Sequence, residues 1–523
     1  MRKGKSISTN FLIQGSILAV AGIICRIIGF VYRIFMIDAL DNDGLAYYSR
    51  AYNVYNIALI ISSYGMPLAV SKLIATKVAL KEYKNERRIL YGAMSFALIT
   101  GLVTALVVFF CDDFFAVTLF NMPECALPLK VLAPTIFMCA IMGTLRGYFQ
   151  GNGNMVPTSI SQIIEQIINA VVSVVATITF MKIYNDKSYG AAGGTLGTTI
   201  GALSGLLFLI IIFIITNRER KEKINSDITS NKDAYSDIYK LILITIMPII
   251  ISQTVYNLNG IIDSSVFCHL NNSKYNDKLI GAYDVYTLMV SIPVAIATAL
   301  SNSLVPVIVK ERVKGNADNV KVRIHMAIKY NMIIAIPAVV GLLVMSNNIV
   351  KLLFPRSSYI DVSTNLIMIG SLAVVFYALS TISTAILQAI ELMKVPIINS
   401  SISLVVHLIF VVILIKNGFG IYSLAIGNVI FALGVAILNW IVISRKLQYK
   451  QEIKYTFIIP TICAIIMGIC VLLVNKTLST FINSNIVVTI VCVISAVCIY
   501  SFLLIKLNVL KITDIMKVIK KNK

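Results

Sequence analysis

Charged residues are scarce in this sequence. Only 13% of its 523 residues are Asp, Glu, Lys or Arg, about half the share found in soluble globular domains. Apolar residues reach 58%, and the mean hydropathy is +0.86. This composition excludes an ordinary soluble domain. It predicts an all-α polytopic membrane protein, because about 20 apolar residues form one transmembrane helix.

Motifs for catalysis and for metal binding are also missing. The sequence has 3 histidines, no nucleophile elbow, no phosphate-binding loop, no HExxH and no cluster with metal-ligand spacing. Its nine cysteines are spaced for neither zinc nor a redox pair. We therefore expect no enzyme activity, no catalytic residue, no metal and no cofactor. The longest expected inner loop, 217–240, is too short for a nucleotide-binding domain, which argues against an ATP-driven pump.

The net charge of +21 does not indicate nucleic acid binding, since the sequence contains no long basic domain and no RNA-binding motif. In a membrane protein, the position of the basic residues matters more than their sum. Apolar runs predict fourteen spans. They lie near 11–37, 47–71, 89–110, 127–149, 156–181, 190–216, 238–262, 283–309, 327–346, 364–390, 396–415, 420–444, 455–474 and 485–505.

The basic residues predict the orientation of these spans. With the N-terminus inside, the inner segments hold 33 Lys and Arg, Arg146 among them, and the outer segments hold 9. Cytoplasmic loops carry the excess of positive charge in membrane proteins. Both termini are therefore expected in the cytoplasm.

Two pairs of similar segments indicate an internal repeat. Residues 150–157 (QGNGNMVP) are echoed by 388–396 (QAIELMKVP), and 44–49 (GLAYYS) by 281–286 (GAYDVY), at offsets of 237 to 239. Six spans separate the copies, an even number, so a parallel repeat about an axis along the membrane normal is expected.

This repeat predicts three parts of the chain. Residues 1–237 form an N-terminal lobe with spans one to six and the following cytoplasmic loop, and 238–445 form a C-terminal lobe with spans seven to twelve. Residues 446–523 add two helices and a basic cytoplasmic tail, which is expected to attract anionic membrane lipids.

Three arginines, Arg26, Arg33 and Arg50, lie inside the first two expected spans. Arg26 falls near mid-depth and Arg33 about 10 Å further out, at 1.5 Å per residue. Arginine in the bilayer centre is costly, so these side chains are expected to face a wet cavity, with a structural ion pair as the other interpretation. Arg50 lies about one turn inside the outer end of the second span. It either belongs to the same site or extends its side chain to the membrane surface.

The fifth expected span carries a polar stripe with i, i+3, i+4, i+7 spacing, formed by Gln162, Glu165, Gln166 and Asn169. Glu165 could pair with Arg26, contact a substrate, or carry a proton, and the whole stripe could instead join helices. Gln253 and Asn257, four residues apart in the seventh span, are weaker candidates for the same cavity.

Three segments carry a resemblance to a known family. They are 25–33 (CRIIGFVYR), 65–72 (GMPLAVSK) and 146–157 (RGYFQGNGNMVP). They resemble the polysaccharide biosynthesis and stage V sporulation protein B family, which is related to the MurJ lipid II flippases within the superfamily that includes MATE exporters. The resemblance covers essentially the whole chain. It implies a two-lobed flippase of six plus six plus two helices.

The resemblance also implies a cargo, an undecaprenyl-pyrophosphate-linked saccharide such as lipid II or a related cell-wall or spore-cortex precursor. This cargo would move from the inner to the outer leaflet of the bacterial plasma membrane by alternating access. Arg26 matches the first-span arginine that lines the family's cavity, Arg33 is one residue out of the expected spacing, and Arg50 has no secure counterpart. The eighth span lacks the cavity arginine of MurJ proteins.

Besides a lipid-linked oligosaccharide and membrane lipids, the expected partners include a coupling cation, and we expect a monomer that binds no nucleic acid. The alternative function is a cation-coupled, MATE-type exporter of small drugs or metabolites. That alternative predicts a cavity dominated by acidic residues, whereas the charge inside the first lobe is mainly basic.

Overall fold

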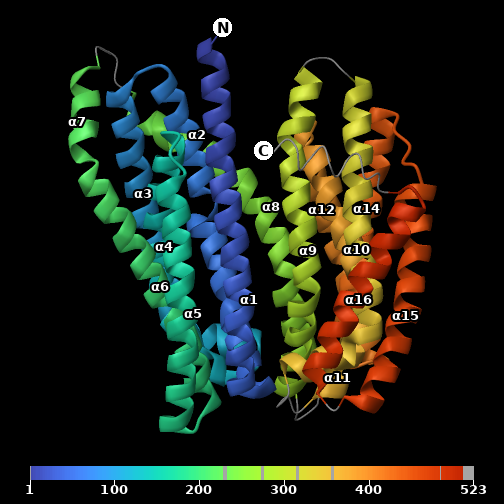
Figure 1. The fold of residues 1–523 in the computed structure, drawn as a ribbon. Helices are drawn as coiled ribbons and strands as arrows, with labels where there is room; N and C mark the ends of the chain where they lie inside the picture. The colour runs from blue at the N-terminus through green and yellow to red at the C-terminus, as the bar shows by residue number, and fades with distance from the viewer. Residues whose placement is uncertain are drawn as a thin grey trace. The chain divides into compact units, whose positions relative to one another are not determined.

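The computed structural model describes residues 2–227, 233–271, 276–313, 317–354, 359–482 and 484–509. Within these ranges every regular element is a helix, which confirms the all-α expectation. The chain forms two compact units, Met1–His269 and Leu270–Lys523, and each is described here by itself (Figure 1).

The first unit holds eight α-helices and three shorter helical turns. They are α1 (Arg2–Leu59), η1 (Ile60–Tyr64), α2 (Met66–Ala79), α3 (Tyr83–Phe110), η2 (Phe114–Leu119), η3 (Pro123–Cys125), α4 (Ala126–Gly151), α5 (Val156–Tyr184), α6 (Lys187–Ile215), α7 (Asn217–Asn225) and α8 (Tyr235–Leu270).

The second unit continues with α9 (Asn276–Val313), α10 (Ala317–Leu353), α11 (Ile360–Gly370), α12 (Ala373–Ala389), α13 (Lys394–Lys416), α14 (Tyr422–Leu447), η4 (Lys454–Ile458), α15 (Ile459–Phe481) and α16 (Asn485–Lys506). Helices α11 and α12 meet at a bend of 47° and together cover the expected tenth span.

Asp41 divides α1 into two helices. Its backbone angles, φ 56° and ψ −173°, are not helical, and a positive φ is uncommon for a residue other than glycine. The chain therefore changes direction at Asp41 without a loop. The expected first span lies before it, and the candidate span Asp38–Ala79 contains the expected second span.

Eleven helices in the described part of the chain are long and apolar enough to cross a membrane, or up to twelve if the bent pair α11 and α12 forms one span. The expected first and seventh spans fall in α1 and α8, whose side chains are described only in part. Many side chains on the candidate spans are exposed and aliphatic, Ile99, Ile214 and Leu473 among them. Exposed faces of this kind suit contact with lipid.

The first part of α8 belongs to the core of the first unit. Ile238, Ile242 and Ile246 are buried together with residues of α2, α3, α4 and α6. The approach is close, since a Cβ on Gly65 would lie 3.0 Å from Cγ2 of Ile246. The compact units therefore divide after His269, one helix later than the lobes expected from the repeat, and the repeat itself stays a prediction.

Helices α5 and α6 lie against each other along glycines of α6. A Cβ on Gly201 would stand 2.6 Å from the carbonyl oxygen of Glu165, and one on Gly193 would stand 2.7 Å from the carbonyl oxygen of Ala176. Only glycine allows backbones to come this near, as at small-residue interfaces between membrane helices. This contact holds the polar stripe of α5 in a fixed position.

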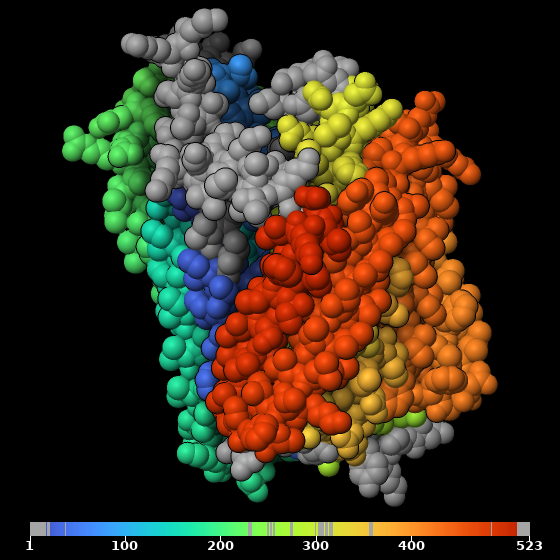
Figure 2. All heavy atoms as spheres, turned by 45° about the vertical axis from the view of Figure 1, so that its right-hand side comes forward, coloured from blue at the N-terminus to red at the C-terminus, as the bar shows by residue number. Residues whose placement is uncertain are grey.

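In the second unit, α15 and α16 lie side by side on the surface and contact α10 (Figure 2). Asn348 of α10 joins them, since its Nδ2 donates to Oδ1 of Asn475 at 3.0 Å and its carbonyl accepts from Nδ2 of Asn485 at 3.0 Å. The two C-terminal helices are thus fastened to the unit by amide hydrogen bonds.

Candidate functional site

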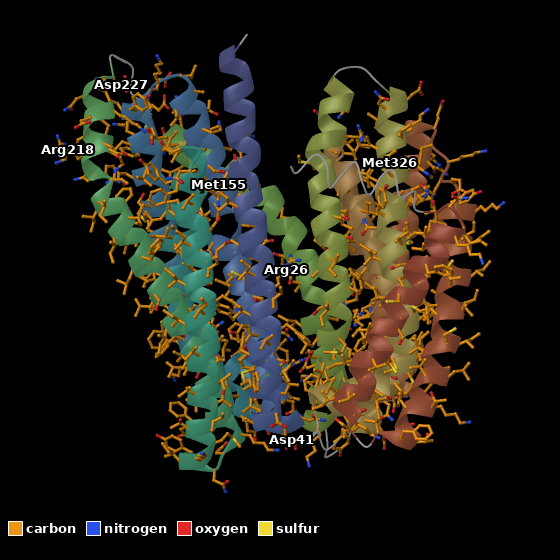
Figure 3. The ribbon with its side chains drawn as sticks, in the orientation of Figure 1. Arg26, Asp41, Met155, Arg218, Asp227 and Met326 are labelled. Carbon is orange, nitrogen blue, oxygen red and sulfur yellow. The ribbon has the colours of Figure 1, made fainter. Side chains whose placement is uncertain are left out.

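The first unit contains a set of polar side chains inside its helix bundle, contributed by α1, α4, α5 and α6. Arg26, labelled in Figure 3 part-way along α1, is exposed. The neighbouring Cys25 lies within electrostatic range of Arg146 and Glu165. The first half of α1 therefore borders on the polar stripe of α5.

Glu165 has a partner that the sequence analysis did not foresee. Arg146 of α4 donates from Nη2 to Oε2 of Glu165 at 2.7 Å and from Nε to Oγ of Ser161 at 3.0 Å. Both charged side chains are shielded, with 13% of Arg146 and 26% of Glu165 exposed. Of the three options for Glu165, pairing with Arg26 is therefore wrong, because its carboxylate pairs with Arg146.

Arg146, which the sequence analysis counted among the inner charges, lies in the last two turns of α4. One signal in the sequence could have found it, because the expected fourth span, 127–149, already contained this residue. The partner could not be found in the same way. Nothing in the spacing of residues says which helix lies beside α4.

Asn169 joins α5 to α6 and to the second half of α1. Its Oδ1 accepts from Oγ of Ser173 at 2.9 Å and from Oγ1 of Thr198 at 3.3 Å, and Tyr52 forms a hydrogen bond with Thr198. These hydrogen bonds join helices, which was the alternative role considered for the polar stripe of α5. Asn169 is buried, so its side chain is covered by the helices that it joins.

Arg33 is surrounded by tyrosines from both halves of α1. It is partly buried and in electrostatic contact with Tyr32, Tyr48 and Tyr52. Its Nε forms no hydrogen bond within the described structure. The tyrosine hydroxyls, two of which lie 3.4 Å apart, were missed from the sequence, where aromatic residues in apolar runs look like ordinary packing.

Gln162 and Gln166 are half-buried on α5. Nε2 of Gln166 would be 3.1 Å from a Cβ on Gly29, so this amide lies directly against α1. Neither glutamine forms a hydrogen bond to any residue that the structure describes. Their amide groups are therefore available to a polar ligand beside α1.

The other expected site residues lie apart from this set. Arg50 is 1% exposed and lies near the thiol of Cys125, so it does not reach the surface as one interpretation held. Asn257 is exposed on α8. The side chain of Gln253 lies outside the described residues. Among the residues that are described, no group of three or more His, Cys, Asp or Glu could hold a metal ion.

A family profile described as "Polysaccharide biosynthesis protein" matches residues 12–312, and a second, described as "MatE", matches 248–413. The first match covers more than half of the chain. The chain belongs to the polysaccharide biosynthesis protein family.

Curated relatives of similar length support this membership. Lipid II flippase MurJ of Bacillus subtilis (strain 168) is 26% identical over 497 residues, with 90% of each chain covered. Stage V sporulation protein B of the same organism is 25% identical over 473 residues, covering 87% of this chain and 88% of the relative.

Solved structures share the fold. An inward closed conformation of lipid II flippase MurJ matches with a TM-score of 0.69 at 16% identity, covering 94% of this chain and 98% of that one. An inward-facing multidrug resistance MATE family transporter matches with a TM-score of 0.63 at 16% identity, covering 80% and 94%. The resemblance inferred from the sequence motifs is thereby confirmed.

Family, relatives and fold together support a membrane flippase or transporter of the bacterial plasma membrane. Of the proteins named above, MurJ is a flippase and the MATE family protein is a transporter.

Proposed function

We propose that this protein moves an undecaprenyl-pyrophosphate-linked saccharide, lipid II or a related peptidoglycan precursor, from the inner to the outer leaflet by alternating access. The observation that carries the proposal is the charge inside the first unit. Glu165 is paired with Arg146, so the carboxylate of the stripe does not make this interior acidic. Arg33, which is partly buried, then gives it a basic character, and Arg26 adds an exposed positive charge on α1.

The cargo follows from relatives and chemistry together. A relative with 26% identity over most of both chains is a lipid II flippase. An anionic pyrophosphate fits a basic interior, since two opposite charges about 5 Å apart gain about 3 kcal/mol at an effective dielectric constant of about 20. This attraction offsets much of the cost of removing the pyrophosphate from water.

In this mechanism each polar group has a task. Arg26 and Arg33 attract the pyrophosphate, and the amides of Gln162 and Gln166 contact sugar or peptide groups. The lipid tail stays in the bilayer. The membrane potential, negative inside, favours outward movement of the anion by about 2.3 kcal/mol per charge per 100 mV. Unchanged flipping after the potential is dissipated in vesicles would remove the potential as the driving force.

The proposal includes the arrangement expected from the sequence: fourteen transmembrane helices, two six-helix lobes related by a parallel repeat, and both termini in the cytoplasm. Placement of a tag that reacts only from one side of the membrane, at each terminus and at 182–187, tests this topology. The termini should react from the inside and the 182–187 segment from the outside.

A second candidate is a cation-coupled exporter of small molecules. The observation in its favour is the "MatE" profile match over 248–413. Such a transporter needs a carboxylate that can release a cation or a proton. Glu165 serves this purpose poorly, because its carboxylate is occupied by Arg146.

Depletion of the protein in its native host distinguishes the two functions. We expect a lipid-linked saccharide to accumulate with its head group facing inward, and wild-type protein to reverse this. Arg26→Ala should reach the membrane without restoring flipping. Arg218→Ala is the matched control, because Arg218 is an exposed surface arginine of α7 (Figure 3). Unchanged lipid intermediates with altered drug or metabolite efflux would favour the exporter.

A further inference from the structure

A cavity of about 180 Å³ lies in the first unit where α3, α4, α6 and α7 meet. Water occupies about 30 Å³ per molecule in the liquid, so the cavity has room for a small polar group. Its walls combine aromatic and basic side chains, and they are formed by Tyr83, Glu86, Arg87, Leu90, Tyr91, Tyr148, Phe213, Asn217, Arg220, Lys221, Lys223 and Ile224.

Four of these side chains are cationic, Arg87, Arg220, Lys221 and Lys223, against one carboxylate, that of Glu86. Glu86 is buried and accepts from Nδ2 of Asn152 at 2.8 Å. None of the four cations forms an ion pair with an acidic residue among those that the structure describes. The cavity thus carries positive charge that the protein itself does not neutralise.

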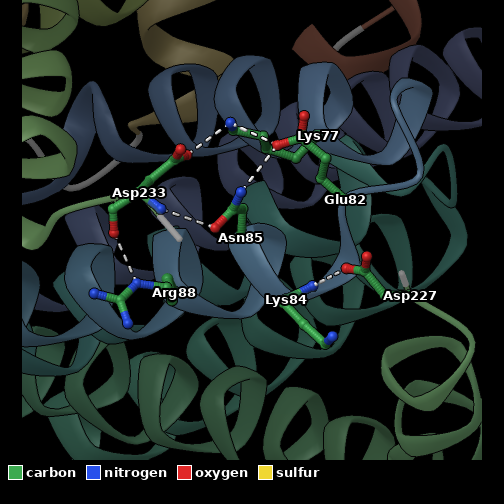
Figure 4. A network of polar contacts seen from close by, with 7 residues as sticks. All are labelled: Lys77, Glu82, Lys84, Asn85, Arg88, Asp227 and Asp233. Atoms are coloured by element: carbon green, nitrogen blue, oxygen red, sulfur yellow. Dashed lines mark hydrogen bonds and ion pairs between the residues drawn. The ribbon is translucent and has the colours of Figure 1, made fainter. Parts of the chain in front are cut away.

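A second basic cluster at the same end of the unit shows the contrast (Figure 4). There, Lys77 pairs with Glu82 at 2.9 Å and with Asp233 at 2.7 Å, and Nε of Arg88 donates to the carbonyl of Asp233 at 2.8 Å. These cations hold the chain at Asp233 against α2 and α3. The cations in the cavity have no carboxylate partner of this kind among the described residues.

Arg220 is held in place by its surroundings. Its guanidinium stacks over Phe213, with Cζ 3.5 Å from the ring centroid, and donates to Oγ1 of Thr216 at 2.9 Å and to Oδ1 of Asn217 at 3.3 Å. Burial lowers the pKa of Arg220, which indicates a cation with incomplete compensation. Its neighbours orient this charge but do not neutralise it.

The cavity lies at the ends of two candidate membrane spans, α3 from Tyr83 and α6 to Ile215. Its wall residue Tyr91 is 53% exposed and shares a helix face with the exposed Leu98 and Leu102, seven and eleven residues further along α3. Exposed Ile214 and Ile215 end α6 beside it. A molecule in the cavity would therefore adjoin an apolar surface suited to acyl chains.

We propose that this cavity binds the phosphate of an anionic membrane phospholipid, with Arg87, Arg220, Lys221 and Lys223 as its cationic partners and the acyl chains along α3 and α6. Arginine and lysine are the usual partners of phosphate groups. Basic pockets between membrane helices bind lipid head groups in this way. The exposed apolar face favours a lipid over a soluble phosphate. The site is separate from the polar residues around Arg26. The proposal therefore does not depend on which cargo the protein moves.

The test uses the purified full-length protein, freed of native lipid, and counts bound lipids by native mass spectrometry. The probes are phosphatidylglycerol and phosphatidylcholine with the same acyl chains. Phosphatidylglycerol should bind about tenfold more tightly, and Arg220→Gln should remove about tenfold of its affinity, the scale expected for one charge-assisted hydrogen bond. Arg218→Gln, the same change on the exposed face of α7, should leave binding unchanged.

A second variant distinguishes a loss of lipid binding from a loss of folding. Lys221→Gln combined with Lys223→Gln changes only exposed side chains and should also weaken phosphatidylglycerol binding about tenfold. Equal binding of both lipids, or equal loss in Arg218→Gln, would overturn the proposal in favour of general surface attraction. Displacement of the lipid by an equal concentration of inorganic phosphate would overturn it in favour of a soluble anion.

Discussion

Arg146 of α4 and Glu165 of α5 form an ion pair of 2.7 Å inside the helix bundle of the first unit, and Ser161 accepts the second hydrogen bond of the same guanidinium. Removing one of the two charges leaves the other without its partner and shielded from water. The pair therefore joins two helices and also determines the charge of the interior that they line.

We expect a coupling free energy of about 1–3 kcal/mol between Arg146→Gln and Glu165→Gln in a double-mutant cycle, because breaking a largely shielded pair on one side costs more than removing both charges. Denaturant unfolding of the purified protein measures it. The exposed pair Arg218 and Glu222, 3.2 Å apart, is the control and should couple by less than about 0.5 kcal/mol. Similar values for the two pairs would contradict the prediction.

Gly201→Ala should destabilise the protein by about 1–3 kcal/mol, because the new methyl group meets the backbone carbonyl of Glu165 at 2.6 Å and overpacking has costs of this size. Gly341→Ala is the control in α10, where a Cβ meets nothing within 4 Å. It should stabilise the protein by up to about 1 kcal/mol through helix propensity. Thermal unfolding in detergent compares both, and the opposite order would be evidence against the close α5 and α6 contact.

Arg33→Gln should lower flipping of the lipid-linked substrate at least about tenfold in vesicles, because it removes a charge-assisted contact. Arg33→Lys should keep part of the activity, since it retains the charge but loses the planar fork. Tyr52→Phe, which removes only the hydroxyl bonded to Thr198, should leave most activity. Full flipping by Arg33→Gln would exclude Arg33 from the substrate path.

The contacts around Glu82 predict a dependence of stability on pH. Hydrogen bonds from Lys77 and then Asn85 lower the pKa of the Glu82 carboxyl below its ordinary 4.5. A group with a lowered pKa in the folded state stabilises that state above its unfolded pKa, and the contribution disappears as pH falls through the folded value. The difference in melting temperature between wild type and Glu82→Gln should be constant above about pH 5 and shrink below pH 4. A difference that grows in acid would contradict this sign.

The membrane fold could be predicted because its cause is local. Runs of apolar residues, read one at a time, identify helices that must cross a bilayer, and the described helices correspond to most of the expected spans. Arg26 and the α5 stripe were found because their cost in lipid is also visible residue by residue.

Pairings between helices could not be predicted. That Arg146 reaches Glu165, that Thr198 reaches Asn169, and that glycines of α6 meet the backbone of α5 all depend on which helices are neighbours. A repeat in the sequence predicts that the boundary between the lobes lies where the second copy begins. The packing of Ile238, Ile242 and Ile246 against the first unit is a tertiary property that such a repeat does not specify.

That packing determines where the chain could be divided into two polypeptides. A break at 228–232 would strip the first fragment of three isoleucines that fill its core and leave them uncovered at the start of the second. A break at 272–275 would give each fragment the helices of one compact unit. Two plasmids encoding 1–271 and 272–523 are thus the better pair for reconstituting the protein from separate halves.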